Sequence, residues 1–368
     1  MTERSDIYKS SIVNRQSSIP ALPSWLMIHI VRICNKILTF LICFVALWAC
    51  LTTPVPASVS KKNVDHFELV QKKLVKDGFD HEKIQRLYSR PQVFFETKGV
   101  TLLFTYSEAK LDYDQFAADR PIDKAKKYML KYKKDLDRTE KAYGVDSHVI
   151  TAILLVESRL GKYLGTRSTL NTLSTLASLM DPHTRTEFYD QIPQAKRISR
   201  KKFEKSAQRR SKWAYKELKA FLEYTHQEGF DPAEIPGSFA GALGLSQFMP
   251  SSILTYGKDG NNDGSIDLYT HADAIASIAN YLKSHGWHPG ISRKKAEKVI
   301  YRYNHSEYYV KAILKIADLL KKSATTSKAG GMSMAPGRVR GHLCWGPLIF
   351  KKNFLISVLS DLSVLMTT

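Results

Sequence analysis

The sequence predicts a mainly α-helical protein, and three observations favour this fold class. Between residues 64 and 320, apolar residues recur mainly at the three- and four-residue spacing of helices, as in 122–143 and 272–282. Runs that alternate apolar and polar residues, as strands do, are few and short. Hydrophobic residues make up 43% of the chain and aromatic residues 11%, which suits a packed core. A folded helical body is therefore expected from about residue 60 to 322.

The chain begins with a predicted leader in residues 1–58. Residues 37–51 form an apolar run that follows Arg32 and Lys36 and precedes the small-residue segment PVPASVS, the layout of a secretory signal. The run is shorter than the ~20 apolar residues of a spanning helix, although extension back to Trp25 leaves an uncleaved anchor open. Cys50, in the segment LWAC, loosely resembles a lipidation site, and the alternative is an ordinary apolar cysteine. We expect an exported protein that is periplasmic or anchored to the membrane facing the periplasm.

The net charge and the positions of the cysteines limit which binding partners and metals we expect. Lysines and arginines exceed aspartates and glutamates by 55 to 35, and this net charge of +20 attracts polyanions. The basic runs are short and no nucleic-acid module surrounds them, so we expect no nucleic-acid partner; cell-wall peptide carboxylates or anionic lipid would respond to the same charge. No cysteine falls between residues 51 and 343, so the helical body needs neither a disulfide nor a cysteine-ligated metal.

After an N-terminal helical region (61–118), the segment GVDSHVITAILLVESRLG predicts a helix capped by Asp146 or Ser147 and ending near Gly161. Glu157 lies at the far end of this helix among apolar neighbours, so its carboxyl is expected to be partly desolvated. Desolvation raises the pKa of a carboxyl, as a general acid at neutral pH requires. Taken alone, the segment favours the alternative that Glu157 forms a structural ion pair at the helix end.

Residues 237–250, GSFAGALGLSQFMP, indicate a loop followed by a short helix. Glycines allow a ligand to approach the backbone closely. Ser238 and Gln247 can hydrogen-bond a sugar, and Phe239 or Phe248 can offer an apolar face. Packing alone could also explain this composition.

A third segment of interest resembles the opening of a calcium-binding loop. Glycine stands at the sharp turn, as Gly264, but position twelve is Thr270 where a bidentate glutamate belongs. The alternative is an Asx-rich turn without an ion. The oxygen ligands at alternate positions are Asp259, Asn261, Asp263 and Ser265.

Near the end of the body, tyrosines cluster at positions 301, 303, 308 and 309, and in isolation they favour a helical core stripe over a ligand platform. The tail, residues 323–368, starts with a Ser/Thr/Ala/Gly stretch and fits no period, so we assign it no role.

Four blocks in one order resemble the membrane-bound lytic murein transglycosylases of the MltB type. They are VESRLGKYLGTRSTLNTLSTLA (156–177), GSFAGALGLSQFMPSS (237–252), DGNNDGSIDLYTHADAIASIANYLKSHGW (259–287) and RYNHSEYYVKAI (302–313). The resemblance implies a lysozyme-like catalytic domain in residues 119–322, added to the N-terminal helical region and an EF-hand-like loop. The interval from Trp287 to Tyr303 is short for the family, so a small subdomain is expected to be reduced.

The resemblance also implies a set of site residues. The catalytic glutamate falls on Glu157, and Asp273 stands where an aspartate completes the family's metal loop, a position that also suits a helix cap. The family's arginine pair meets the segment MDPHTR, where Arg185 alone could serve. The implied substrate-binding residues are Ser238, Gln247, Phe248, Tyr281, Tyr303, Asn304, Tyr309 and Arg185.

The implied reaction needs one carboxyl group. Glu157 would protonate the glycosidic oxygen between N-acetylmuramic acid and N-acetylglucosamine in peptidoglycan, then deprotonate the muramyl 6-hydroxyl, leaving a 1,6-anhydromuramyl end. No second acidic residue is obviously placed for a hydrolase. We expect a monomer without a cofactor for chemistry, with structural Ca²⁺ and with membrane contact through the leader or a lipid. The alternatives are a hydrolytic muramidase and a non-catalytic peptidoglycan-binding scaffold.

Overall fold

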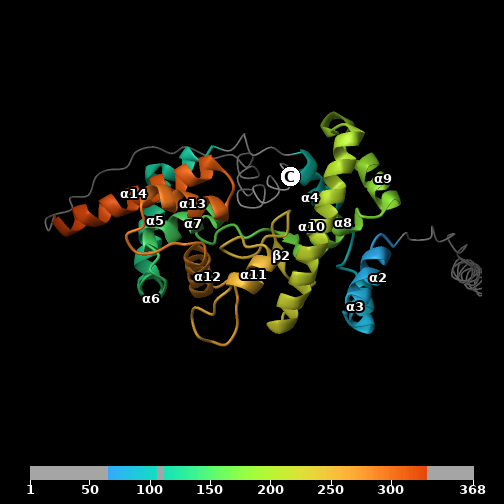
Figure 1. Ribbon diagram of the computed structural model, residues 1–368, viewed down its shortest axis with the longest axis horizontal. Coiled ribbons are helices and arrows are strands. Elements are labelled where there is room, and N and C mark those ends of the chain that lie inside the picture. Colours follow the sequence, from blue (N-terminus) through green and yellow to red (C-terminus); the bar gives the residue numbers. More distant parts are fainter. Residues whose placement is uncertain (1–64, 106–111, 330–368) are drawn as a thin grey trace, which may run out of the picture. The chain divides into compact units, whose positions relative to one another are not determined.

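The computed structural model describes residues 65–105 and 112–329, with side chains described up to residue 322 (Figure 1). The predicted leader with Cys50 lies outside the described residues, as does the tail beyond residue 329. Helices dominate the described residues, which confirms the mainly α prediction. The elements are α2 (Glu68–Lys76), α3 (His81–Tyr88), α4 (Thr97–Thr105), η2 (Asp114–Ala117), α5 (Asp119–Lys131), α6 (Lys133–Tyr143), α7 (Ser147–Ser158), β1 (Arg167–Ser168), α8 (Thr169–Ser178), α9 (Pro182–Gln191), η3 (Gln194–Lys196), α10 (Arg200–Gln227), β2 (Pro236–Gly237), α11 (Pro250–Tyr256), α12 (His271–Ser284), α13 (Arg293–Tyr303) and α14 (Glu307–Ala329).

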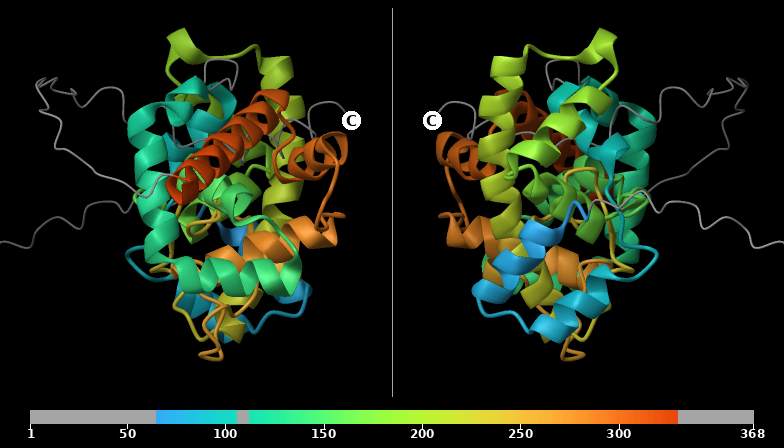
Figure 2. Two further views of the ribbon diagram at one scale, coloured as in Figure 1. Left: turned by 90° about the vertical axis from the view of Figure 1, so that its left-hand side faces the viewer. Right: turned by 90° about the vertical axis from the view of Figure 1, so that its right-hand side faces the viewer.

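Two buried helices form the centre of the fold. Every residue of α8 is buried, and α8 packs along the 28-residue α10. Helix α7 is buried from Val149 to Ser158 and packs against α14 (Figures 1 and 2). Both helices combine Leu, Ile, Val and Ala with buried Ser and Thr, and several of these hydroxyls donate to backbone carbonyls three or four residues earlier, as in Thr151, Ser158 and Ser178.

The N-terminal helices pack on this centre. Helices α2 and α4 contact α8, and the hydroxyls of Tyr88 and Ser174 lie 2.7 Å apart. Glu96 joins the same region to β1, because its carboxylate accepts from the Arg167 guanidinium at 2.8 Å and from the Gly99 N–H at 2.9 Å. The predicted N-terminal region is thus attached to the rest of the described fold.

Two predicted helices differ in extent from the expectation. The helical stretch 122–143 is broken at Tyr132, whose φ of −104° and ψ of 27° separate α5 from α6. Helix α7 ends at Ser158 instead of near Gly161, because Arg159 and Leu160 both have left-handed φ values, 51° and 64°. The sequence period does not reveal either break.

Two short strands hold the glycine-rich loop, residues 237–250, against the segment that follows α7. Strands β1 and β2 are antiparallel, with Arg167 opposite Gly237 and Ser168 opposite Pro236. Gly165 has a φ of +95°, and a β-carbon there would lie 2.0 Å from the Gly237 carbonyl oxygen. Glycine is therefore required for this close backbone approach.

Only residues 285–292 separate α12 from α13, so the chain passes directly from Trp287 to the tyrosine-bearing helices. No helix within residues 65–105 and 112–329 is both long and apolar enough to cross a bilayer.

Candidate active site

Glu157 lies in the last turn of α7. The Asp146 side chain caps the other end of the helix by accepting from the His148 N–H at 2.9 Å, as predicted for this residue. All residues from Val149 to Val156 are buried, and Glu157 itself is only 5% exposed. A carboxyl group is thus held in an apolar surrounding by a well-capped helix.

Tyr309 of α14 is a hydrogen-bond partner of this carboxyl. Its hydroxyl donates to Glu157 Oε1 at 2.8 Å. Burial, followed by the charge of Glu157, raises the pKa of Tyr309 well above its ordinary value, so the phenol stays protonated and remains a donor. Arg167, one possible partner for an ion pair at this helix end, pairs with Glu96 instead.

The predicted tyrosines and Phe248 form one aromatic cluster that begins at Tyr309. The Tyr303 ring is stacked on Tyr309, with centroids 6.4 Å apart, and lies 5.8 Å from the ring of Phe248. The ring of Tyr281 lies 5.6 Å from Phe248 and 5.0 Å from Tyr303. Residues from α12, α13, α14 and the loop before α11 therefore meet beside Glu157.

Most members of this cluster are buried. Phe248, Tyr303 and Tyr309 lie within the core, whereas Tyr281 is half-buried; Asn304, which follows Tyr303, is also buried. The hydroxyl of Tyr303 donates to the Ser246 carbonyl at 2.6 Å, and that of Tyr281 donates to the Arg302 carbonyl at 2.6 Å. These contacts favour the core-stripe interpretation for the tyrosines, and direct contact with a sugar stays a prediction.

Ser238 and Gln247 shape the loop from which Phe248 projects. The Ser238 hydroxyl accepts from the N–H groups of Ala240 and Ala242, at 3.3 and 3.0 Å. Gln247 has a left-handed φ of 50°, and its side-chain amide donates to the Gly244 carbonyl at 2.7 Å. A non-glycine residue in this conformation costs about 1–3 kcal/mol and is typical of functional loops.

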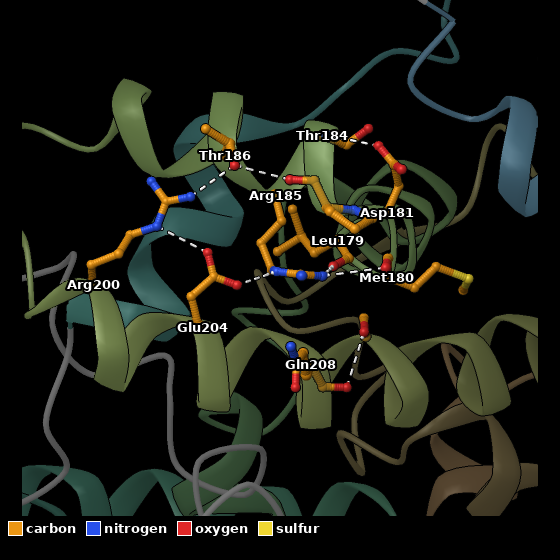
Figure 3. A network of polar contacts seen from close by, with 11 residues as sticks. Leu179, Met180, Asp181, Thr184, Arg185, Thr186, Arg200, Glu204 and Gln208 are labelled. Atoms are coloured by element: carbon orange, nitrogen blue, oxygen red, sulfur yellow. Dashed lines mark hydrogen bonds and ion pairs between the residues drawn. The ribbon is translucent and has the colours of Figure 1, made fainter.

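Arg185, which was predicted to contact the substrate, is held by structural partners in the fold. It is buried, its Nε donates to Glu204 Oε2 at 2.5 Å, and its Nη1 donates to the carbonyls of Leu179 and Met180 at 2.7 and 3.2 Å (Figure 3). Burial opposes the charge of Glu204, but hydrogen bonds from Arg185 and Arg200 keep the pKa of that carboxyl below its ordinary value. The guanidinium thus ties α9 to α10, and a contact of Arg185 with the substrate stays a prediction.

The predicted metal loop is held together by hydrogen bonds to its own backbone. Asp259 accepts from the N–H groups of Asn262 and Gly264 at 2.6 and 2.8 Å. At the closing position, both carboxylate oxygens of Asp273 likewise accept backbone N–H groups, those of Gly260 and Asp267. Within the described part of the chain, no group of three or more His, Cys, Asp or Glu side chains is arranged to hold a metal.

Asp273 is also not the helix cap that the sequence suggested. Thr270 is the N-cap of α12, without a side-chain cap bond, and Asp273 lies in the first turn, where it fastens the preceding loop. Burial raises the pKa of the Asp273 carboxyl.

Two contributors to the site were not predicted. Tyr113 packs edge-on against Tyr309, with ring centroids 6.2 Å apart. Glu217 of α10 holds the start of α11, accepting from the N–H and the hydroxyl of Ser251 at 2.9 and 2.8 Å. Both lie far in sequence from the residues they contact, and no local motif marks them.

The helical architecture, with Glu157 buried at the end of α7, defines the class of this protein: a lysozyme-like helical fold. Residues 62–297 match the family described as "Transglycosylase SLT domain", and the chain belongs to this family. It is 30% identical over 234 residues to membrane-bound lytic murein transglycosylase B of Escherichia coli K12, covering 61% of this chain and 57% of that protein. The chain thus spans a little over half the length of this relative.

Solved structures show the same fold. The soluble lytic transglycosylase SltB1 of Pseudomonas aeruginosa aligns with a TM-score of 0.58 and 24% identity over 70% of this chain and 99% of that one. The Escherichia coli lytic transglycosylase Slt35, solved in complex with calcium, aligns with a TM-score of 0.56 and 25% identity over 72% and 95% of the two chains. The resemblance predicted from the four sequence blocks is confirmed at the level of family and fold.

Proposed function

We propose that the protein is a lytic transglycosylase that cleaves the β-1,4 bond between N-acetylmuramic acid and N-acetylglucosamine in peptidoglycan. The observation that carries the proposal is the buried Glu157 carboxyl with its hydrogen bond from Tyr309, in a family of transglycosylase domains. The related Escherichia coli protein is named a lytic murein transglycosylase, which supports the same substrate class.

Glu157 serves as both acid and base in the proposed reaction. Its protonated carboxyl transfers a proton to the glycosidic oxygen, the bond to C1 of the muramyl residue breaks, and N-acetylglucosamine leaves with a free 4-hydroxyl. The resulting carboxylate then takes the proton of the muramyl 6-hydroxyl, whose oxygen bonds to C1. The product carries a 1,6-anhydromuramyl end, no water is consumed, and Glu157 is protonated again.

The other buried acidic side chains support a single-carboxyl mechanism. Among the described residues they are Glu96, Glu217 and Asp273. Each is bound to a structural partner: Glu96 to Arg167, Glu217 to Ser251, and Asp273 to two backbone N–H groups. A hydrolase of the retaining type needs a second carboxylate about 5 Å from the first.

In the decisive experiment, purified peptidoglycan is digested with the full-length protein and, separately, with its Glu157→Gln variant. Mass spectrometry then identifies the soluble products. Anhydromuropeptides from the first protein and none from the second are expected. Reducing-end muropeptides would convert the assignment to a hydrolytic muramidase. A folded protein that binds peptidoglycan and yields no product would be a scaffold instead.

We also propose that Asp259, Asn261, Asp263, Ser265 and Asp273 hold a structural Ca²⁺, as Slt35 was solved with calcium. The ion would join the loop before α12 to that helix. Millimolar CaCl₂ should raise the melting temperature of the wild type and leave Asp259→Asn unchanged, with MgCl₂ as the control. Equal melting temperatures with and without CaCl₂ would reject the site.

The leader supports a proposed location on the outer side of the cytoplasmic membrane, with the folded part in the periplasm. Mass spectrometry of the mature N-terminus would distinguish signal cleavage from acylation at Cys50 and from retention of the whole leader.

A further inference from the structure

A cavity, here called the basic pocket, lies beside the end of α7. Its volume is about 440 Å³, and its walls come from η2, the first turns of α5 and the segment from Leu155 to Tyr163. Neither the proposed reaction nor the metal loop uses it.

The charge of the basic pocket is unbalanced. Arg120, Lys124, Arg159 and Lys162 line it, and none of the described residues in its wall is acidic. Arg120, Lys124 and Lys162 make no ion pair with any described residue. Burial, and then repulsion from the other three cations, lowers the pKa of Lys124. A bound anion would relieve this repulsion. The positive charge of the pocket therefore favours a negatively charged ligand.

One of the cations is held in place by its surroundings. The Arg159 guanidinium lies 5.5 Å from the ring centroids of both Phe116 and Tyr163, and it donates to the Gln115 side chain at 3.2 Å. The left-handed backbone of Arg159 and Leu160 turns the chain at this point, a conformation that the surrounding packing has to maintain. Arg159 is thus preorganised, while the three other cations are exposed and can adapt.

The apolar part of the wall indicates what kind of anion fits. Phe116, Pro121 and Tyr163 line the same cavity as the cations. A bare phosphate would use the cations alone, whereas a peptide that carries carboxylates would use both kinds of surface. An acidic peptide is therefore the favoured ligand class.

The basic pocket adjoins the candidate active site. Leu155 and Arg159, which line it, lie two residues before and two after Glu157. Its η2 wall directly follows Tyr113, whose ring packs against Tyr309, a hydrogen-bond partner of Glu157. A ligand in the pocket therefore contacts the two segments that position the catalytic carboxyl.

We propose that the basic pocket binds carboxylates of the stem peptide carried by the glycan strand that is being cleaved. This inference rests on the proposed function, because it takes peptidoglycan as the substrate. It adds that the enzyme distinguishes strands that carry peptides from strands that lack them.

The test compares two triple variants of the full-length protein with equal loss of charge. The pocket variant is Arg120→Gln/Lys124→Gln/Lys162→Gln. The control is Lys127→Gln/Lys134→Gln/Lys216→Gln, whose residues are exposed and do not line the cavity. Calorimetry measures binding of the free stem pentapeptide, of the same peptide with amidated carboxyls, and of inorganic phosphate. Cleavage is measured on strands with their peptides and on strands stripped by an amidase.

The pocket variant should bind the pentapeptide about tenfold more weakly, while the control changes less than about twofold. The amidated peptide and phosphate should bind more weakly than the pentapeptide. The pocket variant should lose kcat/KM on peptide-bearing strands and keep it on stripped strands. Three results would overturn the inference. Pentapeptide binding could weaken equally in both variants, or the pocket variant could lose kcat/KM equally on both substrates. The amidated peptide or phosphate could also bind the wild type as tightly as the pentapeptide does.

The two proposals can fail separately. If the wild type cleaves no strand but the pocket variant alone loses pentapeptide binding, the proposed reaction is rejected and the peptide site stands. If strands are cleaved equally well by both variants, the reaction stands and the peptide site is rejected.

Discussion

At the scale of single residues, the hydroxyl of Tyr309 is expected to orient the carboxyl of Glu157. Replacing Tyr309 with Phe removes one hydrogen bond to an ionisable group, worth about 1.5–3 kcal/mol, so cleavage of peptidoglycan should slow about 10- to 100-fold. The matched control is Tyr308→Phe, because Tyr308 is 73% exposed and lies next in the chain. Muropeptide release measures both rates. A Tyr309→Phe protein as fast as the control would show that the bond does not assist the reaction.

Arg185 illustrates how a residue assigned to substrate can serve structure. Its side chain is 8% exposed and satisfies two carbonyls and Glu204, so Arg185→Ala should lower the free energy of unfolding by about 3–5 kcal/mol. Arg200→Ala removes the other, more exposed cation from Glu204 and should cost about 1 kcal/mol or less. Urea denaturation measures both values. Unchanged stability together with lost peptidoglycan binding would return Arg185 to the binding site.

At the scale of elements, the β1–β2 ribbon places the loop that carries Ser238, Gln247 and Phe248. Gly165→Ala would push a methyl group into the Gly237 carbonyl at a positive φ, so we expect a loss of about 2 kcal/mol or more in stability and slower cleavage. Gly229→Ala is the control, since its φ is also positive, +72°, but no atom lies within 4 Å of the added carbon. Thermal unfolding and muropeptide release report both effects. Similar costs for the two variants would mean that backbone strain, and not the close approach, matters.

At the scale of the whole molecule, the net charge of +20 should govern attraction to the anionic wall. Raising NaCl from about 50 to about 500 mM shortens the Debye length to a few ångströms, so binding to isolated peptidoglycan should weaken about tenfold. Binding to chitin, an uncharged glycan, should stay unchanged. Pelleting assays measure both. Salt-independent binding to peptidoglycan would show that short-range contacts, and not the overall electrostatic field, set the affinity.

The sequence correctly predicted the helical class, the cap at Asp146 and the place of Glu157 near the end of an apolar helix, because helical spacing and capping are local properties. It did not predict the break at Tyr132 or the early end of α7, where packing around single residues overrides the period. It also did not predict the partners that Arg185 and Asp273 have within the fold, since each side chain had several acceptors or donors within reach and only the folded geometry selects among them.

The sequence by itself determined most of the helical segments and the order of motifs that places this chain in the transglycosylase SLT domain family. Only the tertiary structure decided that Tyr309 bonds Glu157, that Tyr113 supports Tyr309, and that four cations from two separate segments share one pocket. The physical reason is how far apart in the sequence the interacting residues lie. Helix formation depends on residues three and four apart, whereas the contacts that make a site join residues up to 152 positions apart and arise only when the core packs.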